Sequence, residues 1–187
     1  MMQVTRLVLS EAEQRLLASL RGSEWVHLSG DMFDNEFLAW DAVRLQCSTS
    51  AILIELPREV IDIGGDCDDY AVLHIRPASS LSAAAERAGS VYYQGRGETV
   101  RNIWVIRDTV TGTRTEHPDF THTADVAVVF GLDTMSTSIQ RAGRFSDAFL
   151  IRRSPTREEL SLPDTEDEWE SDLLDQYTVS REWIPIV

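Results

Sequence analysis

This chain contains no lysine, and its basic side chains other than histidine are 17 arginines. Without lysine the protein can form no Schiff base with a carbonyl substrate, and it lacks the lysine of a P-loop phosphate site. Cysteine is scarce as well, since Cys47 and Cys67 are the only two. Two cysteines cannot build a disulfide framework, and we expect both to be free thiols in a reducing compartment.

Long apolar runs and positive charge are also missing. No stretch approaches the roughly 20 apolar residues that a membrane-spanning helix requires. The N-terminal residues become polar too soon for the apolar core of a signal peptide. The net charge of −14 and the pI of 4.6 exclude the basic surface that nucleic acids and anionic membranes bind. We therefore expect a cytoplasmic protein that binds neither nucleic acid nor membrane.

The length and the order of apolar residues indicate the fold class. A chain of 187 residues with a hydrophobic content of 43% suits one domain over residues 1–187. Ser10 and Glu13 have the spacing of a capping box, which predicts an N-terminal helix over Ser10–Arg21. Beyond it, short alternating runs are separated by turn signals, among them an expected bend at Gly64–Asp69 and an expected hairpin turn at Thr111-Gly112. We predict an α+β fold: a mainly antiparallel curved sheet, as a sandwich or open barrel, with an N-terminal helix and an acidic C-terminal helix.

The C-terminal part of the chain carries most of the negative charge. Glu158–Asp175 contains nine acidic residues and no basic one. Trp169, Leu173 and Tyr177 are spaced for one face of a helix. Residues 154–177 are therefore predicted to form an acidic helical segment that packs on or near the sheet. Its candidate partner-binding residues are Glu166, Asp167, Glu168, Trp169, Glu170 and Asp172.

Two stretches hold residue types that bind metals. Asp66, Asp68 and Asp69 follow two glycines between apolar runs, and clustered carboxylates suit Mg²⁺ or Ca²⁺. The second stretch offers imidazole and carboxylate ligands that suit zinc or iron. Neither has the spacing of a calcium loop, a zinc finger or a helical HExxH site, so a solvated turn and a polar loop are the alternative interpretations. The residues of the second stretch are His117, Asp119 and His122.

Five arginines precede the acidic segment, and they have two interpretations. Guanidinium groups can grip a phosphate or a carboxylate of a ligand. Alternatively they pair with the acidic segment of the same chain or of a second subunit. These residues are Arg141, Arg144, Arg152, Arg153 and Arg157.

The sequence contains no nucleophile elbow and no phosphate-binding loop motif. The leading hypothesis is therefore a non-enzymatic interaction or regulatory protein whose acidic surface binds a basic protein partner, without a cofactor. One alternative is a metal-dependent hydrolase that uses the clustered aspartates and histidines with a divalent metal. Another is a small-ligand-binding β protein with an apolar pocket lined by Trp40, Tyr92 and Trp104. Apolar strand edges are compatible with a homodimer, but no residue specifies one.

Overall fold

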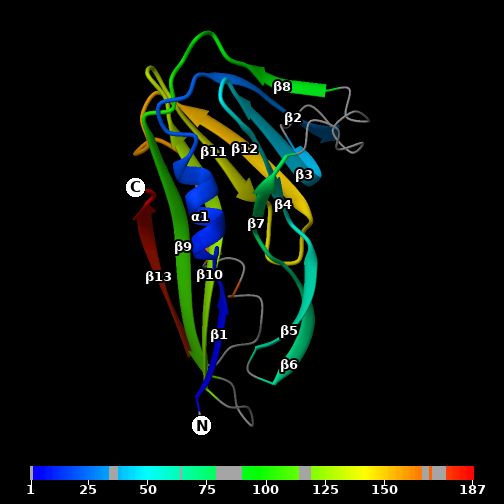
Figure 1. Ribbon diagram of the computed structural model, residues 1–187. Coiled ribbons are helices and arrows are strands. Elements are labelled where there is room, and N and C mark those ends of the chain that lie inside the picture. The colour runs from blue at the N-terminus through cyan, green and yellow to red at the C-terminus, as the bar shows by residue number, and fades with distance from the viewer. Residues whose placement is uncertain are drawn as a thin grey trace.

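The computed structural model describes residues 2–33, 38–63, 65–78, 90–113, 119–165, 169 and 176–187 (Figure 1). Within them the chain forms thirteen β-strands and one regular α-helix. In chain order these are β1 Gln3–Leu7, α1 Glu11–Ala18, β2 Trp25–Phe33, β3 Leu38–Cys47, β4 Ala51–Glu55, β5 Arg58–Ile63, β6 Asp66–Ala71, β7 His74–Pro77, β8 Ser90–Gln94, β9 Asn102–Thr113, β10 Phe120–Gly131, β11 Ser136–Arg141, β12 Ala148–Ser154 and β13 Gln176–Pro185.

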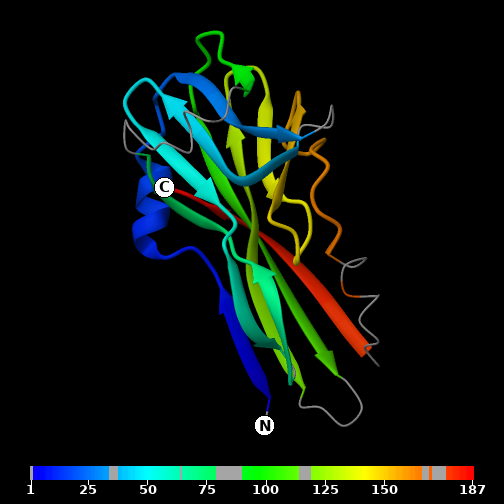
Figure 2. The same cartoon turned by 90° about the vertical axis from the view of Figure 1, so that its right-hand side faces the viewer.

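One large sheet contains eleven of these strands, and its main path runs β13-β9-β10-β11-β12-β3-β2-β8. β1 joins it in parallel at β10, while β4 joins at β3 and carries β7 on its other side. β5 and β6 form a separate hairpin. The large sheet curls, so that β4, β7 and α1 face the inner side of β9 and β10 across the main apolar core (Figures 1 and 2).

An aspartate lies at each of two positions where one edge of a strand pairs with two different strands in succession. β10 pairs with β1 through its first half and with β11 through its last half, and Asp125 lies between them at a β-bulge. Its buried carboxylate accepts the amide N–H of Leu9 at 2.8 Å and two N–H groups of Arg107 at 2.7 and 3.1 Å. On β3, Asp41 has a φ of 58° between the stretches that pair with β12 and β4. Such kinks let a sheet curl around a core.

The N-terminal helix begins where the sequence predicts. Ser10 is its N-cap, and the capping box with Glu13 is confirmed by reciprocal hydrogen bonds. Leu17 is fully buried against the sheet, as expected of the apolar face. The regular helix ends at Ala18 and not at Arg21, and irregular turns follow it.

The α+β prediction is wrong, because the described fold is mostly antiparallel β with a single regular helix of eight residues. The acidic C-terminal helix is not supported. Residues 158 and 159 form a turn, and residues 160–164 have no regular structure. Between β12 and β13 only Thr165 and Trp169 are described with helical backbone. Pro163 gives the physical reason, since proline disfavours helical angles at Leu162 before it. The antiparallel sheet itself is confirmed, and it stays open.

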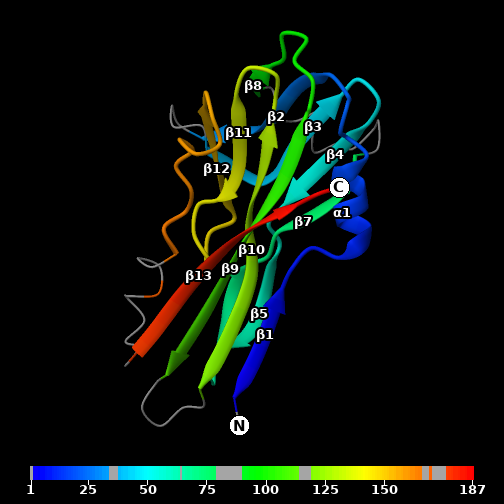
Figure 3. The same ribbon diagram turned by 90° about the vertical axis from the view of Figure 1, so that its left-hand side faces the viewer.

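Two turns lie elsewhere than predicted. In the bend expected at Gly64–Asp69, Ile63 pairs with Asp66, so only two residues connect β5 to β6 and the aspartates belong to a strand. Thr111-Gly112, expected as a hairpin turn, lies inside β9. Both flanks of β9 are paired there, with β10 and with β13 (Figure 3), and this pairing overrides the local turn preference.

The outer face of β9 and β10 is covered by the chain that follows β12. We call residues 155–165 the covering segment, which Figure 2 shows in orange along one side of the molecule. Its Leu160 packs with Ile106, Ala127 and Val129 into a second apolar core. Because Pro163 and Thr165 are buried as well, the segment is attached along its length and is not a loose tail.

We expect Asp125→Asn to destabilise the fold strongly, by about 3–5 kcal/mol, because it leaves Arg107 in the sheet without its counter-charge. The measurement is the free energy of unfolding in urea. Glu11→Gln is the control, since the Glu11–Arg15 pair on α1 is 88% and 77% exposed and its loss should change little. Equal effects of the two substitutions would contradict the role assigned to Asp125.

Candidate binding site

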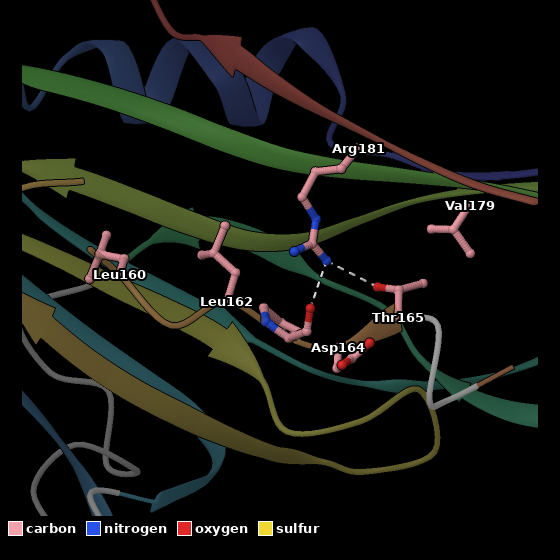
Figure 4. A pocket seen from close by; sticks show the side chains of 7 residues that line it. Leu160, Leu162, Asp164, Thr165, Val179 and Arg181 are labelled. Carbon is pink, nitrogen blue, oxygen red and sulfur yellow. Dashed lines mark hydrogen bonds between the residues drawn. The ribbon is translucent and has the colours of Figure 1, made fainter. Parts of the chain in front are cut away.

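A pocket of about 460 Å³ lies between the covering segment and β13 (Figure 4). This volume is within the range of ligand sites in proteins, roughly 300–1,000 Å³. The exposed side chain of Asp164 stands at its opening. Its lining residues are Leu160, Leu162, Pro163, Asp164, Thr165, Val179 and Arg181.

The wall of the pocket is an ion pair between Arg181 of β13 and Asp108 of β9, which are opposite each other in the strand register. The pair is bidentate, with both N···O distances at 2.7 Å, and the carboxylate of Asp108 is only 2% exposed. Arg181 also donates to the carbonyl of Pro163 at 2.7 Å and to Thr165 Oγ1 at 3.1 Å (Figure 4). The hydroxyl of Thr165 donates to Asp108. Two strands and the covering segment are therefore joined at one buried carboxylate.

The electrostatics of the pocket follow from that network. Asp108 pairs with Arg181 inside the wall, and the exposed carboxylate of Asp164 adds a negative charge at the opening. Leu160 and Val179 contribute apolar walls beside it. This arrangement suits a side chain with an apolar stem and a cationic end.

A second group of ionisable side chains surrounds His122 in the core. The ring of His122 lies 5.7 Å from Tyr70 and 5.5 Å from Trp169 between ring centres, and within the described residues neither ring nitrogen has a hydrogen-bond partner. Burial, together with the charges of Arg141 and Arg144, lowers the pKa of His122 to about 3. The five side chains are at most 4% exposed, so they form part of the core and not a surface that a partner can reach.

The predicted metal ligands that the structure describes do not converge. Asp68 and Asp69 are successive exposed residues of β6, so their side chains point to opposite faces of the hairpin. Asp119 is exposed just before β10, whereas His122 is buried. In the part of the chain that the structure describes, no group of three histidine, cysteine, aspartate or glutamate side chains can hold a metal ion. The side chain of Asp66 and all of His117 lie outside the described residues.

Of the predicted partner-binding residues, Trp169 alone is described. Its ring is 1% exposed, and it stacks on Phe120 with 5.5 Å between ring centres. The guanidinium of Arg144 lies 4.3 Å from the centre of the same ring. Trp169 therefore anchors the chain in the core. The others, Glu166, Asp167, Glu168, Glu170 and Asp172, lie outside the described residues.

The predicted arginine cluster is divided in space. Arg141 and Arg144 are buried near His122, while Arg157 lies 4.9 Å from the ring centre of Trp104 on the outer face. Arg157 also pairs with its neighbour Glu158 at 2.7 Å. Those arginines therefore do not make one patch for a phosphate.

The aromatic residues proposed for an apolar pocket are also apart in what the structure describes. Trp40 is 38% exposed on β3, and Trp104 packs on Trp183 at 6.2 Å between ring centres. The side chain of Tyr92 lies outside the described residues.

Burial raises the pKa of Cys47 to about 12, which leaves no thiolate there at neutral pH.

The sequence interpretation missed Asp108 and Arg181, the pair that shapes the pocket. One signal was present: Asp108 occupies a buried position of β9, between the buried Ile106 and Val110. A charge at an apolar position of a strand requires a partner. The partner is 73 residues away in the sequence, and local spacing cannot identify it.

Comparison of the chain with protein-family models, with curated proteins and with solved structures gave no match. None of the helical residues that the structure describes belongs to a helix with the length and apolar character needed to cross a lipid bilayer. The geometry of the pocket and of the strand beside it is therefore the basis for assigning a function.

The buried, neutral His122 predicts a specific acid sensitivity. Below pH 6.5 the unfolded chain binds a proton at this residue that the folded chain does not bind until about pH 3. The contribution of neutral His122 to the free energy of unfolding is therefore fully present above pH 6.5. Between pH 6.5 and about 3 the free energy of unfolding falls by roughly 1.4 kcal/mol for each unit by which the pH is lowered. We expect His122→Phe to reduce the fall in unfolding free energy measured between pH 6.5 and 4.5. An identical pH dependence in the two proteins would contradict the neutral state of His122.

Proposed function

We propose that the protein is a non-catalytic binding protein whose pocket takes a cationic side chain of a basic protein partner. The observation that carries this proposal is the pocket at the covering segment, where apolar walls lead to the carboxylate of Asp164. Lysine and arginine side chains have the same two parts, an apolar stem and a charged head. Arg181 does not repel such a guest strongly, because Asp108 neutralises it.

The charge of the whole chain supports a basic partner. The net charge is −14, and Glu159 and Asp164 are exposed on the covering segment, where Glu158 pairs with Arg157. A negative potential around the pocket attracts cationic partners and accelerates their association at low salt. The expected interaction is therefore salt-sensitive.

The chemistry of the pocket favours binding over catalysis. The hydroxyl group of Thr165 donates a hydrogen bond to Asp108 and accepts one from an N–H group of Arg181. Asp108 in turn accepts hydrogen bonds from two N–H groups of the same guanidinium. These groups are committed to holding the covering segment on the sheet.

We expect a fluorescent nine-residue peptide of alternating arginine and valine to bind more tightly than its glutamate–valine counterpart. Binding should weaken as sodium chloride rises from 50 to 300 mM, because salt screens exposed charges. Asp164→Asn should reduce the affinity by about threefold to fivefold, the effect of an exposed charge worth up to about 1 kcal/mol. Fluorescence anisotropy measures all three effects.

Glu24→Gln is the matched control, since it removes the same charge from an exposed residue outside the pocket, just before β2. It should leave the affinity close to that of the unchanged protein. Equal losses in Asp164→Asn and Glu24→Gln would mean that the peptide senses only the net charge, and the pocket would not be the site. Equal binding of the basic and acidic peptides would reject the basic partner.

A further inference from the structure

We infer that the outer face of the sheet holds a second site for a cationic side chain of the partner, and that Arg157 occupies this site in the free protein. The inference rests on the proposed function and extends the binding surface beyond the pocket. The second site consists of the rings of Trp104 on β9 and Trp183 on β13 and of the carboxylate of Glu158. We call it the guanidinium site.

The side chain of Arg157 shows which group this site accepts. Its Cζ atom lies 4.9 Å from the ring centre of Trp104 and 5.5 Å from that of Trp183. The two rings are 6.2 Å apart between centres and nearly perpendicular, at 81°. Nε of Arg157 donates to the carboxylate of Glu158 at 2.7 Å. Indole rings attract cations more strongly than other aromatic rings do, and a guanidinium also stacks on them. Two indoles and a carboxylate therefore suit an arginine side chain.

The strand register places the guanidinium site beside the pocket. Trp183 follows Arg181 on the same face of β13, and Arg181 lines the pocket. Two such positions of a strand are roughly 7 Å apart. Leu162 packs with Trp104 and Trp183 against the second apolar core and also lines the pocket. A partner with two cationic side chains can therefore reach both sites on one surface.

Arg157 is held at the rings by interactions that are easily exchanged. Its side chain is 43% exposed, and that of its partner Glu158 is 67% exposed. Exposed ion pairs and exposed cation–π contacts each stabilise a structure only slightly. The covering segment is held in place by other residues, namely Leu160 in the second apolar core and Thr165 on Asp108. Arg157 can therefore leave the rings while the segment stays attached.

Arg157 thus competes with the partner for the guanidinium site. When an arginine of the partner replaces it, the same kinds of contact form again, so the unmodified protein gains little affinity there. Without Arg157 the site is vacant, and its contacts add to the affinity. The partner that fits both sites is an extended segment with arginines at alternate positions, since these are also roughly 7 Å apart.

Arg157→Gln tests the competition with the arginine–valine peptide. We expect the affinity to rise by about threefold, the effect of one exposed cation–π site, measured by fluorescence anisotropy. Arg76→Gln is the matched control, because it removes the same charge from a half-exposed arginine of β7 that is also paired with a glutamate. Its gain in affinity should be smaller.

A second substitution separates the ring contacts from the loss of a nearby positive charge. Trp183→Leu changes no charge and removes one of the two rings. In the Arg157→Gln protein it should return the affinity to about that of Arg76→Gln. Urea unfolding of each variant verifies that it is folded before the peptide is added.

Fluorine NMR reads the same site in the protein with its own sequence, labelled with 5-fluorotryptophan at its five tryptophans. With saturating peptide, the signals of Trp104 and Trp183 should shift, because the cation over their rings is exchanged. The signal of Trp25, which is 0% exposed in the main apolar core, should stay in place.

The outcomes separate this inference from the proposed function. Equal gains in Arg157→Gln and Arg76→Gln would reject the guanidinium site and leave the cationic pocket standing. Unchanged signals of Trp104 and Trp183 while the peptide is bound would reject it as well, and so would a gain that Trp183→Leu does not remove. A peptide that binds neither the unmodified protein nor Arg157→Gln would reject both the guanidinium site and the proposed function.

Discussion

The ion pair between Asp108 and Arg181 is the interaction on which the binding surface depends. A carboxylate that is 2% exposed destabilises a fold by several kcal/mol unless it is paired and hydrogen-bonded. Here two N–H groups of Arg181 and the hydroxyl of Thr165 satisfy it. These partners come from the edge strand β13 and from the covering segment. The need to satisfy one buried charge therefore fixes the pocket wall and the position of the edge strand together.

A second buried ion pair lies beside the first one in the sheet, and its role is to hold the fold together. Arg107 and Asp125 pair across β9 and β10 one residue away from Asp108, and their side chains lie on the opposite face of the sheet. Asp125 also accepts the N–H of Leu9, where the chain leaves β1 for the helix. The Arg107–Asp125 pair thus attaches the N-terminal elements to the inner side of the sheet. The Asp108–Arg181 pair attaches the covering segment to its outer side. The protein uses buried carboxylates where small domains often use longer helices or disulfides.

Local sequence signals located the parts of the fold that local chemistry controls. The capping box of Ser10 and Glu13 predicted the start of α1, and the short alternating runs predicted a mainly antiparallel sheet. The failures have one cause, which is that contacts between distant residues decided the outcome. Thr111-Gly112 lies in a strand because β10 and β13 flank it. The predicted acidic helix is not supported, because irregular chain before Pro163 directs Leu160 into the second apolar core. The pocket was not predictable, since its central pair joins residues 73 positions apart.

The acidity seen in the sequence gains a specific location from the structure, at the pocket between the covering segment and β13. The most direct test of this account is a crystal structure of the protein with the arginine–valine peptide. The account predicts an arginine side chain of the peptide in the pocket beside Asp164. A bound peptide that lies elsewhere on the protein, with the pocket empty, would contradict it.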